Sequence, residues 1–143
     1  MNTSWLIFAL LSAIFAALVA IFGKVGLEKV DSTTATTIRA VIMTLFLIAV
    51  VGFSGKFNLV GSILSNNKAF LFIIFSGIAG ALSWLFYFLA LKTGPVSGVI
   101  SIDKLSLVFA IILAALFLGE HMTFRSFLGI ALIAVGAILV VLK

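Results

Sequence analysis

The sequence contains no cysteine and has only one proline, one histidine and one tyrosine among its 143 residues. Without cysteine the chain has no disulfide and no thiolate metal site. It also has no phosphate-binding loop, dinucleotide-binding glycine pattern or nucleophile with a neighbouring base. Nothing therefore points to nucleotide-driven transport or catalysis, and we expect a protein that is not an enzyme and uses no cofactor or metal.

Charged residues are scarce, at 9%, where a soluble domain carries about 25%. Hydrophobic residues make up 64% and lie in long runs. A bilayer core about 30 Å thick requires about 20 apolar residues in helical form. Five runs are long enough to be transmembrane helices: Trp5–Gly23, Thr34–Phe53, Ala69–Leu91, Val96–Leu118 and Phe124–Leu142. The predicted fold class is an all-α integral membrane protein with a single transmembrane domain over residues 1–143.

The segments between the runs are polar and mostly short. Lys92–Pro95 reads as a tight turn, and Thr123 is placed to cap the N-terminus of the last helix. The longest connection, Ser54–Lys68, fits two interpretations that the sequence leaves open. It is either a flexible loop or an amphipathic helix at the membrane interface, built on Phe57, Leu59, Val60, Ile63 and Leu64.

The net charge of +5 is carried by loop residues near lipid headgroups, which does not indicate nucleic-acid binding. An odd number of spans places the termini on opposite sides of the membrane. The exposed cations on the side of the N-terminus are Lys56, Lys68 and Arg125. Those on the other side are Lys24, Lys29, Lys92 and Lys143. This balance does not fix the orientation, and it fits a protein that inserts both ways.

Polar side chains of three predicted helices gather at one depth. Arg39 lies about 8 Å into the second span, and Asp103 and Lys104 lie about 10–12 Å into the fourth, at 1.5 Å per residue. Trp84 and Tyr87 of the third span fall at a similar level. Ionisable residues inside a span indicate a functional site, because an unpaired charge there costs several kcal/mol. We predict that these five residues form a substrate or coupling site.

Neighbouring residues of a helix point about 100° apart, so Asp103 and Lys104 are expected to diverge. Arg39 is then the natural partner for Asp103, because a guanidinium binds a carboxylate in bidentate fashion. The alternative is that this pair only fixes helix register while Lys104 reaches the interface. Trp84 and Tyr87 are either pocket walls or members of an interfacial aromatic belt.

The charges of Arg39, Asp103 and Lys104 sum to +1 − 1 + 1 = +1. Excess positive charge in a medium of low dielectric constant lowers the energy of an anion. We therefore favour an anionic or zwitterionic small metabolite over a lipophilic cation. If Arg39 neutralises Asp103, Lys104 is the cation left to contact the substrate.

Four motifs carry a resemblance to a known family. They are Asp31-Ser-Thr-Thr-Ala-Thr-Thr-Ile-Arg39, Ser76-Gly-Ile-Ala-Gly-Ala-Leu-Ser-Trp-Leu-Phe-Tyr-Phe-Leu-Ala-Leu91, Val99-Ile-Ser-Ile-Asp-Lys-Leu-Ser106, and Leu118-Gly-Glu120 followed by Thr123. Together they resemble the EamA-type branch of the drug/metabolite transporter superfamily, and in particular its small five-helix bacterial and archaeal members. The resemblance runs across nearly the whole chain.

The resemblance implies that the chain equals one repeat of a ten-helix carrier built from two inverted five-helix repeats. It also implies a dimer, with an antiparallel homodimer favoured, a substrate site between the halves, and the cytoplasmic membrane of a prokaryote. It leaves the substrate open, because the superfamily handles amino acids, nucleotide precursors, sugars and drugs. The first-helix glutamate that couples protons in the related small multidrug exporters has no counterpart here, since the first span contains no acid.

Three hypotheses follow. The leading one is a secondary transporter that works by alternating access as a dimer and contacts its small-molecule substrate and membrane lipid. The second is a lipid-linked metabolite flippase or an accessory subunit of one. The third is a membrane scaffold without transport activity, whose charges only orient helices.

Overall fold

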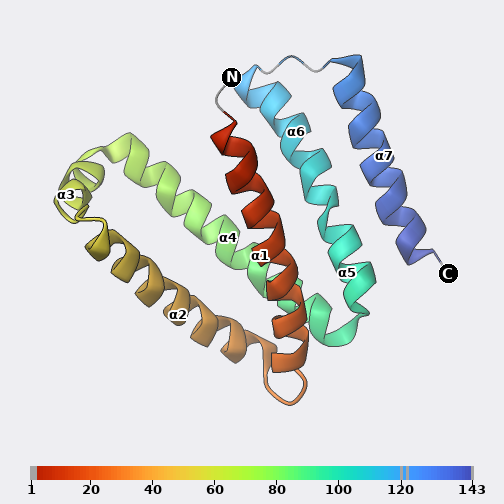
Figure 1. The fold of residues 1–143 in the computed structure, drawn as a ribbon, viewed down its shortest axis with the longest axis horizontal. Helices are drawn as coiled ribbons and strands as arrows, with labels where there is room; N and C mark the ends of the chain where they lie inside the picture. Colours follow the sequence, from red (N-terminus) through yellow and green to blue (C-terminus); the bar gives the residue numbers. More distant parts are fainter. Residues whose placement is uncertain (1–2, 120, 122, 143) are drawn as a thin grey trace. The chain divides into compact units, whose positions relative to one another are not determined.

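The computed structural model describes residues 3–119, 121 and 123–142, and within these ranges the regular secondary structure is helical. Figure 1 shows their order along the chain. Five helical segments of the described residues are long and apolar enough to cross a membrane. They are α1 (Ser4–Gly26), α2 (Ser32–Phe53), α4 (Asn67–Thr93), α5 (Val96–Asp103) with α6 (Leu105–Leu118), and α7 (Phe124–Val141). The five predicted spans are confirmed. Glu120 and Lys143, named above in a motif and in the charge count, lie outside the described residues.

The large apolar side chains of these helices are mostly exposed. Phe53 is 94% and Phe117 80% exposed, which would be very unfavourable in water. The buried hydrophobic residues among those described are few and scattered: Ala20, Leu27, Phe88, Leu91, Ile130 and Ala137. Such a surface suits lipid acyl chains, while the helices satisfy their own backbone polar groups. The predicted all-α integral membrane fold is therefore confirmed.

The chain divides into two compact units, and the first comprises residues up to 25 and from 93 onward. It holds α1, α5, α6 and α7, with α5 and α6 packed against α7. Lys24 at the end of α1 donates a hydrogen bond from Nζ to the carbonyl oxygen of Gly94, at 2.9 Å. A Cβ added at Gly98 of α5 would lie 3.3 Å from Pro95 Cγ and 3.8 Å from Val141 Cγ2 of α7. A side chain at this position would therefore crowd Pro95 first, while Val141 of α7 lies at an ordinary contact distance.

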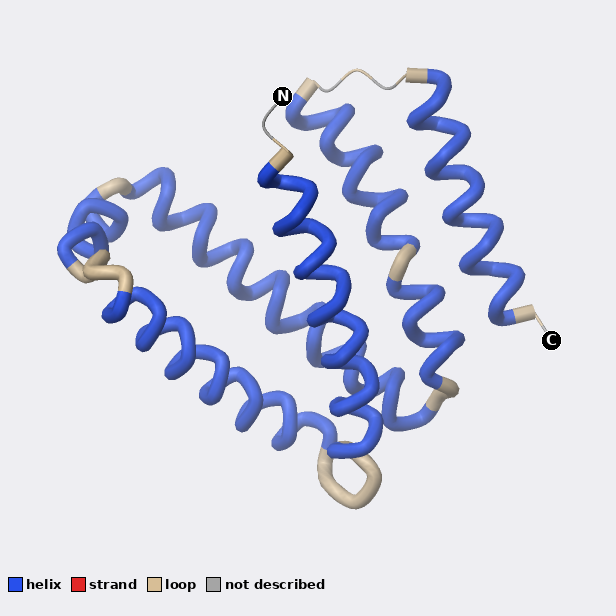
Figure 2. The backbone as a smooth tube through the Cα atoms, viewed as in Figure 1, coloured by secondary structure: helices blue, strands red, loops and turns tan. Residues whose placement is uncertain are grey.

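The fourth span is interrupted at Lys104, which separates α5 from α6 and appears in Figure 2 as a loop segment inside the span. The backbone N–H of Lys104 lies 3.2 Å from the carbonyl oxygens of both Ile100 and Ser101. The N–H of Leu107 bonds to the Lys104 carbonyl at 3.1 Å, three residues back. Such three-residue bonds tighten the helix locally. The predicted span has the correct ends, but it is not one continuous helix.

The second unit comprises residues 26–92 and holds α2, α3 (Asn58–Ser65) and α4. Asp31 caps α2: its carboxylate accepts hydrogen bonds from the Thr34 backbone N–H at 2.7 Å and from the Thr34 hydroxyl at 2.9 Å. The Thr34 backbone N–H is the main reason that the pKa of the Asp31 carboxyl lies below its ordinary value of 3.8. Lys92 at the end of α4 donates from Nζ to the carbonyl oxygen of Val30, at 2.7 Å.

The structure answers two predictions, one about the segment after α2 and one about the start of α7. The segment after α2 contains the helix α3, so the helical alternative holds for Asn58–Ser65, while its place at the membrane interface stays a prediction. The Thr123 hydroxyl oxygen accepts a hydrogen bond from the Ser126 backbone N–H at 3.2 Å, which confirms Thr123 as the N-cap of α7.

We predict that Gly98→Val lowers the free energy of unfolding by about 1–3 kcal/mol, because its side chain must displace Pro95 or Val141. The matched control is Gly129→Val on α7, where an added Cβ meets no atom within 4 Å. Thermal unfolding of the two variants in the same detergent measures the difference. Equal melting temperatures would show that Gly98 does not set the contact between α5 and α7.

Candidate functional site

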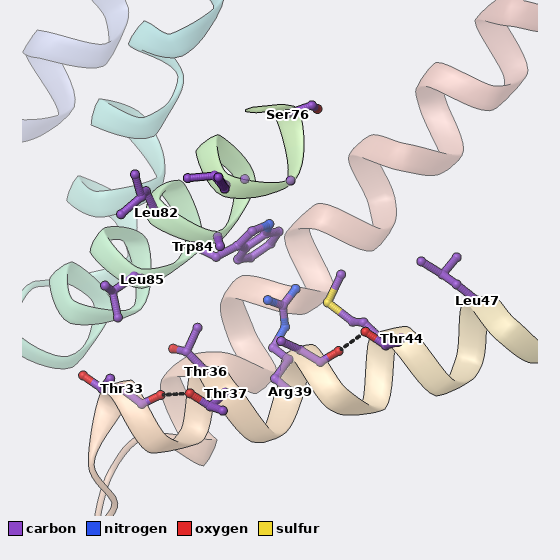
Figure 3. A pocket seen from close by; sticks show the side chains of 16 residues that line it. Thr33, Thr36, Thr37, Arg39, Thr44, Leu47, Ser76, Leu82, Trp84 and Leu85 are labelled. Atoms are coloured by element: carbon purple, nitrogen blue, oxygen red, sulfur yellow. Dashed lines mark hydrogen bonds between the residues drawn. The ribbon is translucent and has the colours of Figure 1, made fainter. Parts of the chain in front are cut away.

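A cavity of about 750 Å³ lies within the second unit, between α2 and α4, and Figure 3 shows the side chains around it. Its volume falls in the range of about 300–1,000 Å³ that is usual for small-molecule sites. Its walls are mainly aliphatic, with threonines along α2 and one cation. The lining residues on α2 are Thr33, Thr36, Thr37, Arg39, Ala40, Met43, Thr44 and Leu47. Those on α4 are Ser76, Gly77, Ile78, Gly80, Ala81, Leu82, Trp84 and Leu85.

Arg39 and Trp84 form the main contact across this cavity. The guanidinium carbon Cζ of Arg39 lies 3.8 Å from the centroid of the Trp84 ring and 5.0 Å from that of Phe88. A guanidinium over an indole face is attracted by the ring quadrupole, and the attraction strengthens as water is removed. Figure 3 shows the Arg39 side chain rising from α2 toward Trp84 on α4. The contact places a cation in the cavity wall.

Two aromatic residues hold the Trp84 ring. Phe88, one helical turn later, stacks on Trp84 with ring centroids 5.6 Å apart and an interplanar angle of 26°. Tyr87 meets Trp84 and Phe88 edge-on, at 5.7 and 5.8 Å with angles of 82°. Phe88 is buried, and its burial anchors the group. Tyr87 contacts Trp84 but is not among the residues that line the cavity.

Three of the four α2 threonines that line the cavity bond back to their own helix through the hydroxyl group. Each donates to the carbonyl oxygen four residues earlier. The three bonds are Thr36 to Ser32 at 2.7 Å, Thr37 to Thr33 at 3.0 Å, and Thr44 to Ala40 at 2.9 Å. These bonds occupy the hydroxyl protons of the three threonines. Their oxygen atoms keep lone pairs that can still accept a hydrogen bond.

Asp103 and Lys104 lie in the first unit, at the interruption between α5 and α6. We expected their side chains to diverge, yet Lys104 Nζ lies 3.5 Å from Asp103 Oδ2. The regular helix stops between them, and the four methylenes of a lysine let its ammonium turn back toward the preceding carboxylate. Both side chains are partly exposed, at 48% for Lys104 and 36% for Asp103.

Of the five predicted site residues, the structure therefore groups Arg39, Trp84 and Tyr87 in one unit and Asp103 with Lys104 in the other. The Arg39–Asp103 pairing stays a prediction, because each unit is described by itself. Within its own unit, Arg39 forms no ion pair among the described residues, and its partners are aromatic.

The sequence prediction missed Phe88, and it counted Thr36 and Thr37 among the polar side chains near Arg39 without including them in the site. Phe88 is one of 15 phenylalanines, and only its position four residues after Trp84 singles it out. The threonine signal was clearer, since Thr33, Thr37 and Thr44 recur at the spacing of one helix face.

The chemistry of the cavity suits binding better than catalysis. A fixed cation, oxygen acceptors and apolar walls can bind and orient a small molecule, but the lining residues supply no nucleophile with a base. Within residues 3–119, 121 and 123–142, no three His, Asp or Glu side chains gather as a metal site would require.

Comparison with known proteins gives a family match and a relative that each cover nearly the whole chain. Residues 3–142 match the sequence profile of the EamA-like transporter family. A protein of Sinorhizobium sp, described as an uncharacterized transporter in the cobO 3′ region, is 44% identical over 139 residues, which cover 97% of each chain. No solved structure gives a significant match. The resemblance drawn from the motifs is confirmed, and the comparisons point to a membrane transporter rather than an enzyme.

We predict an energetic coupling between Arg39 and Trp84 of about 0.5–2 kcal/mol, as expected for a cation–π contact that is partly shielded from water. A double-mutant cycle of Arg39→Met and Trp84→Leu, followed by unfolding in mixed micelles, measures it. The control cycle pairs Arg39→Met with Phe86→Leu, an exposed ring of α4 outside the cavity. Equal coupling in the two cycles would mean that the contact adds nothing to stability.

Proposed function

This chain belongs to the EamA-like transporter family, and on that premise we propose that it is a secondary transporter for a small anionic or zwitterionic metabolite. It works by alternating access, as a dimer, in the cytoplasmic membrane of a prokaryote. The five apolar spans and the transporter relative support the membrane location. The residues that line the cavity in the second unit support the substrate class.

The observation that carries the proposal is the Arg39 guanidinium in the wall of an otherwise mainly aliphatic cavity. In a surrounding of low dielectric constant a fixed cation lowers the energy of an anionic group strongly. Arginine also presents a planar set of donors that fits a carboxylate. Leu47, Leu82 and Leu85 then offer apolar surface to the rest of the molecule.

The contacts within each unit favour Arg39 over Lys104 as the proposed anion contact. Lys104 has a carboxylate 3.5 Å away, whereas the Arg39 partners in its own unit are neutral rings. Asp103 and Lys104 instead mark the interruption of the fourth span. Secondary transporters often place binding or coupling groups at interrupted helices. In the proposed mechanism, this pair responds to the substrate or coupling ion while the span changes shape.

The dimer completes the transporter. Alternating access in inverted-repeat carriers moves one repeat against the other around a central site. A chain with five spans supplies one such repeat, so two copies are required, and an antiparallel pair restores the inverted relation. The nearly balanced loop cations fit insertion in both orientations.

Flux into proteoliposomes tests this function. We expect uptake of some members of a panel of amino acids and organic acids, and little uptake of quaternary ammonium dyes. Arg39→Met should lower the initial rate at least tenfold, because it removes the only charge that the cavity wall in the described unit offers. The matched control is Arg125→Met, which removes an exposed arginine of α7 outside the cavity.

The other outcomes separate the remaining hypotheses. Robust dye transport that Arg39→Met leaves unchanged would contradict the charge argument and indicate a multidrug carrier. Translocation of labelled lipid without solute flux would indicate the flippase. Absence of both activities, in protein shown to be folded, would indicate the scaffold.

A further inference from the structure

The segment between α2 and α4 combines an amphipathic helix with two lysines. It runs from Lys56 to Lys68 and contains α3. Because residues of a helix advance by about 100° each, the large apolar side chains fall on one side of α3 and the polar or small ones on the other. The apolar side carries Phe57, Leu59, Val60, Ile63 and Leu64, and the opposite side carries Asn58, Gly61, Ser62 and Ser65.

The position of α3 between two spans places it at a membrane surface. The helix α2 ends at Phe53 and α4 begins at Asn67, and both are long and apolar enough to cross a membrane. Figure 1 shows α3 at the turn that joins these two ends. Its eight residues extend about 12 Å, which is too short to cross a bilayer. The Phe57 ring packs on the last turn of α2, since a Cβ added at Gly52 would lie 3.1 Å from Phe57 Cε2.

The apolar side of α3 is left uncovered by the described part of the chain. All five of its apolar side chains are exposed, and Phe57 keeps 56% of its surface exposed despite its contact with Gly52. A helix of this pattern lies in the plane of the membrane, with its apolar side about 5–10 Å into the boundary between headgroups and acyl chains. Lipid therefore suits the uncovered side.

The charges beside α3 are positive and have no carboxylate near them within the second unit. Lys56 and Lys68 flank the helix and are exposed. No acidic residue lies between Asp31 and Asp103 in the sequence, so the acids of this unit, Glu28 and Asp31, precede α2. The 22 residues of α2 separate them from α3 by about 33 Å, several times the distance over which salt screens a charge.

A second copy of the chain is a poor match for this charge. A parallel copy would bring the same two lysines to the same surface. An antiparallel copy would bring the opposite surface, where three lysines outnumber two carboxylates: Lys24, Lys29, Lys92, Glu28 and Asp31. An anionic phospholipid supplies what both copies lack, a negative headgroup joined to an apolar chain.

We propose that the segment from Lys56 to Lys68 binds anionic phospholipid. The helix α3 lies among the headgroups, its apolar side contacts the acyl chains, and Lys56 and Lys68 bind lipid phosphates as point charges. This surface is separate from the cavity, because no residue of the segment lines it. It gives the protein a preference among membrane lipids that is independent of the proposed transport.

A fluorophore on α3 tests where the helix lies. The chain has no cysteine, so Ile63→Cys and Ser65→Cys each accept one environment-sensitive label, on the apolar and the polar side. In vesicles of phosphatidylcholine we expect a spin label on the acyl chains to quench the fluorophore at position 63, and aqueous iodide to quench the one at position 65. Quenching at position 63 by iodide alone would overturn the proposal. Protection of position 63 from both quenchers would show that protein covers this side, and would overturn it as well.

The same label at position 63 measures the choice of lipid. The spin label is carried on phosphatidylglycerol or on phosphatidylcholine, at equal fractions of the vesicle lipid. We expect phosphatidylglycerol to be favoured beside α3 about fivefold or more, since one lysine near an anionic headgroup is worth a factor of that order. Replacing both lysines, Lys56→Gln with Lys68→Gln, should reduce the preference to less than twofold.

The control variant is Lys29→Gln, which removes an exposed lysine before the opposite end of α2 and should leave the preference unchanged. Equal quenching by the two lipids in the protein with native lysines would overturn the binding of anionic lipid, as would a preference that survives loss of Lys56 and Lys68. Neither measurement uses solute flux, so such a failure would leave the proposed transport function standing.

Discussion

The contact between the Arg39 guanidinium and the Trp84 ring, at 3.8 Å, is the interaction on which the candidate site depends. An arginine several residues inside a span requires a partner, because a bare charge is costly there. Within its own unit the partner is the face of an aromatic ring, which attracts the cation without neutralising it. The contact holds the guanidinium in place and leaves its charge available for the proposed anion. An arginine paired to a carboxylate would have much less attraction left to offer.

The rest of the second unit maintains this arrangement. Phe88 and Tyr87 fix the orientation of the Trp84 ring, and Gly77 and Gly80 keep the facing wall of α4 low, so that space remains between the helices. Thr36 and Thr37 of α2 line the same cavity as Arg39 and donate their hydroxyl protons to backbone carbonyl oxygens. Asp31 caps the N-terminus of α2, and Lys92 at the end of α4 bonds to the Val30 carbonyl oxygen in the loop before α2. The same local contacts that stabilise α2 and α4 thus also maintain the walls of the cavity.

Much of this fold was predictable from the sequence, because lipid imposes a simple constraint. Each span must be helical and about 20 residues long, so the apolar runs located all five spans and Thr123 marked the start of the last. The interruption at Lys104 was not predictable, since the residues around it contain no proline or glycine that would announce a break. The contact of Arg39 with Trp84 was also not predictable from the sequence. Depth and charge favoured a pair with Asp103, which stays a prediction, whereas cation–π contacts depend on side-chain positions that periodicity does not encode.

Direct binding at Trp84 tests most sharply whether this cavity is a carboxylate site. The chain has two tryptophans, so in a Trp5→Phe background the emission comes from Trp84. The account predicts that leucine changes this emission in a saturable way, and that 3-methylbutylamine, which lacks the carboxylate, does not. It further predicts that Arg39→Met abolishes the leucine response and that Arg125→Met preserves it. An equal response to both compounds, or a leucine response that survives Arg39→Met, would contradict the assignment of Arg39 as the anion contact.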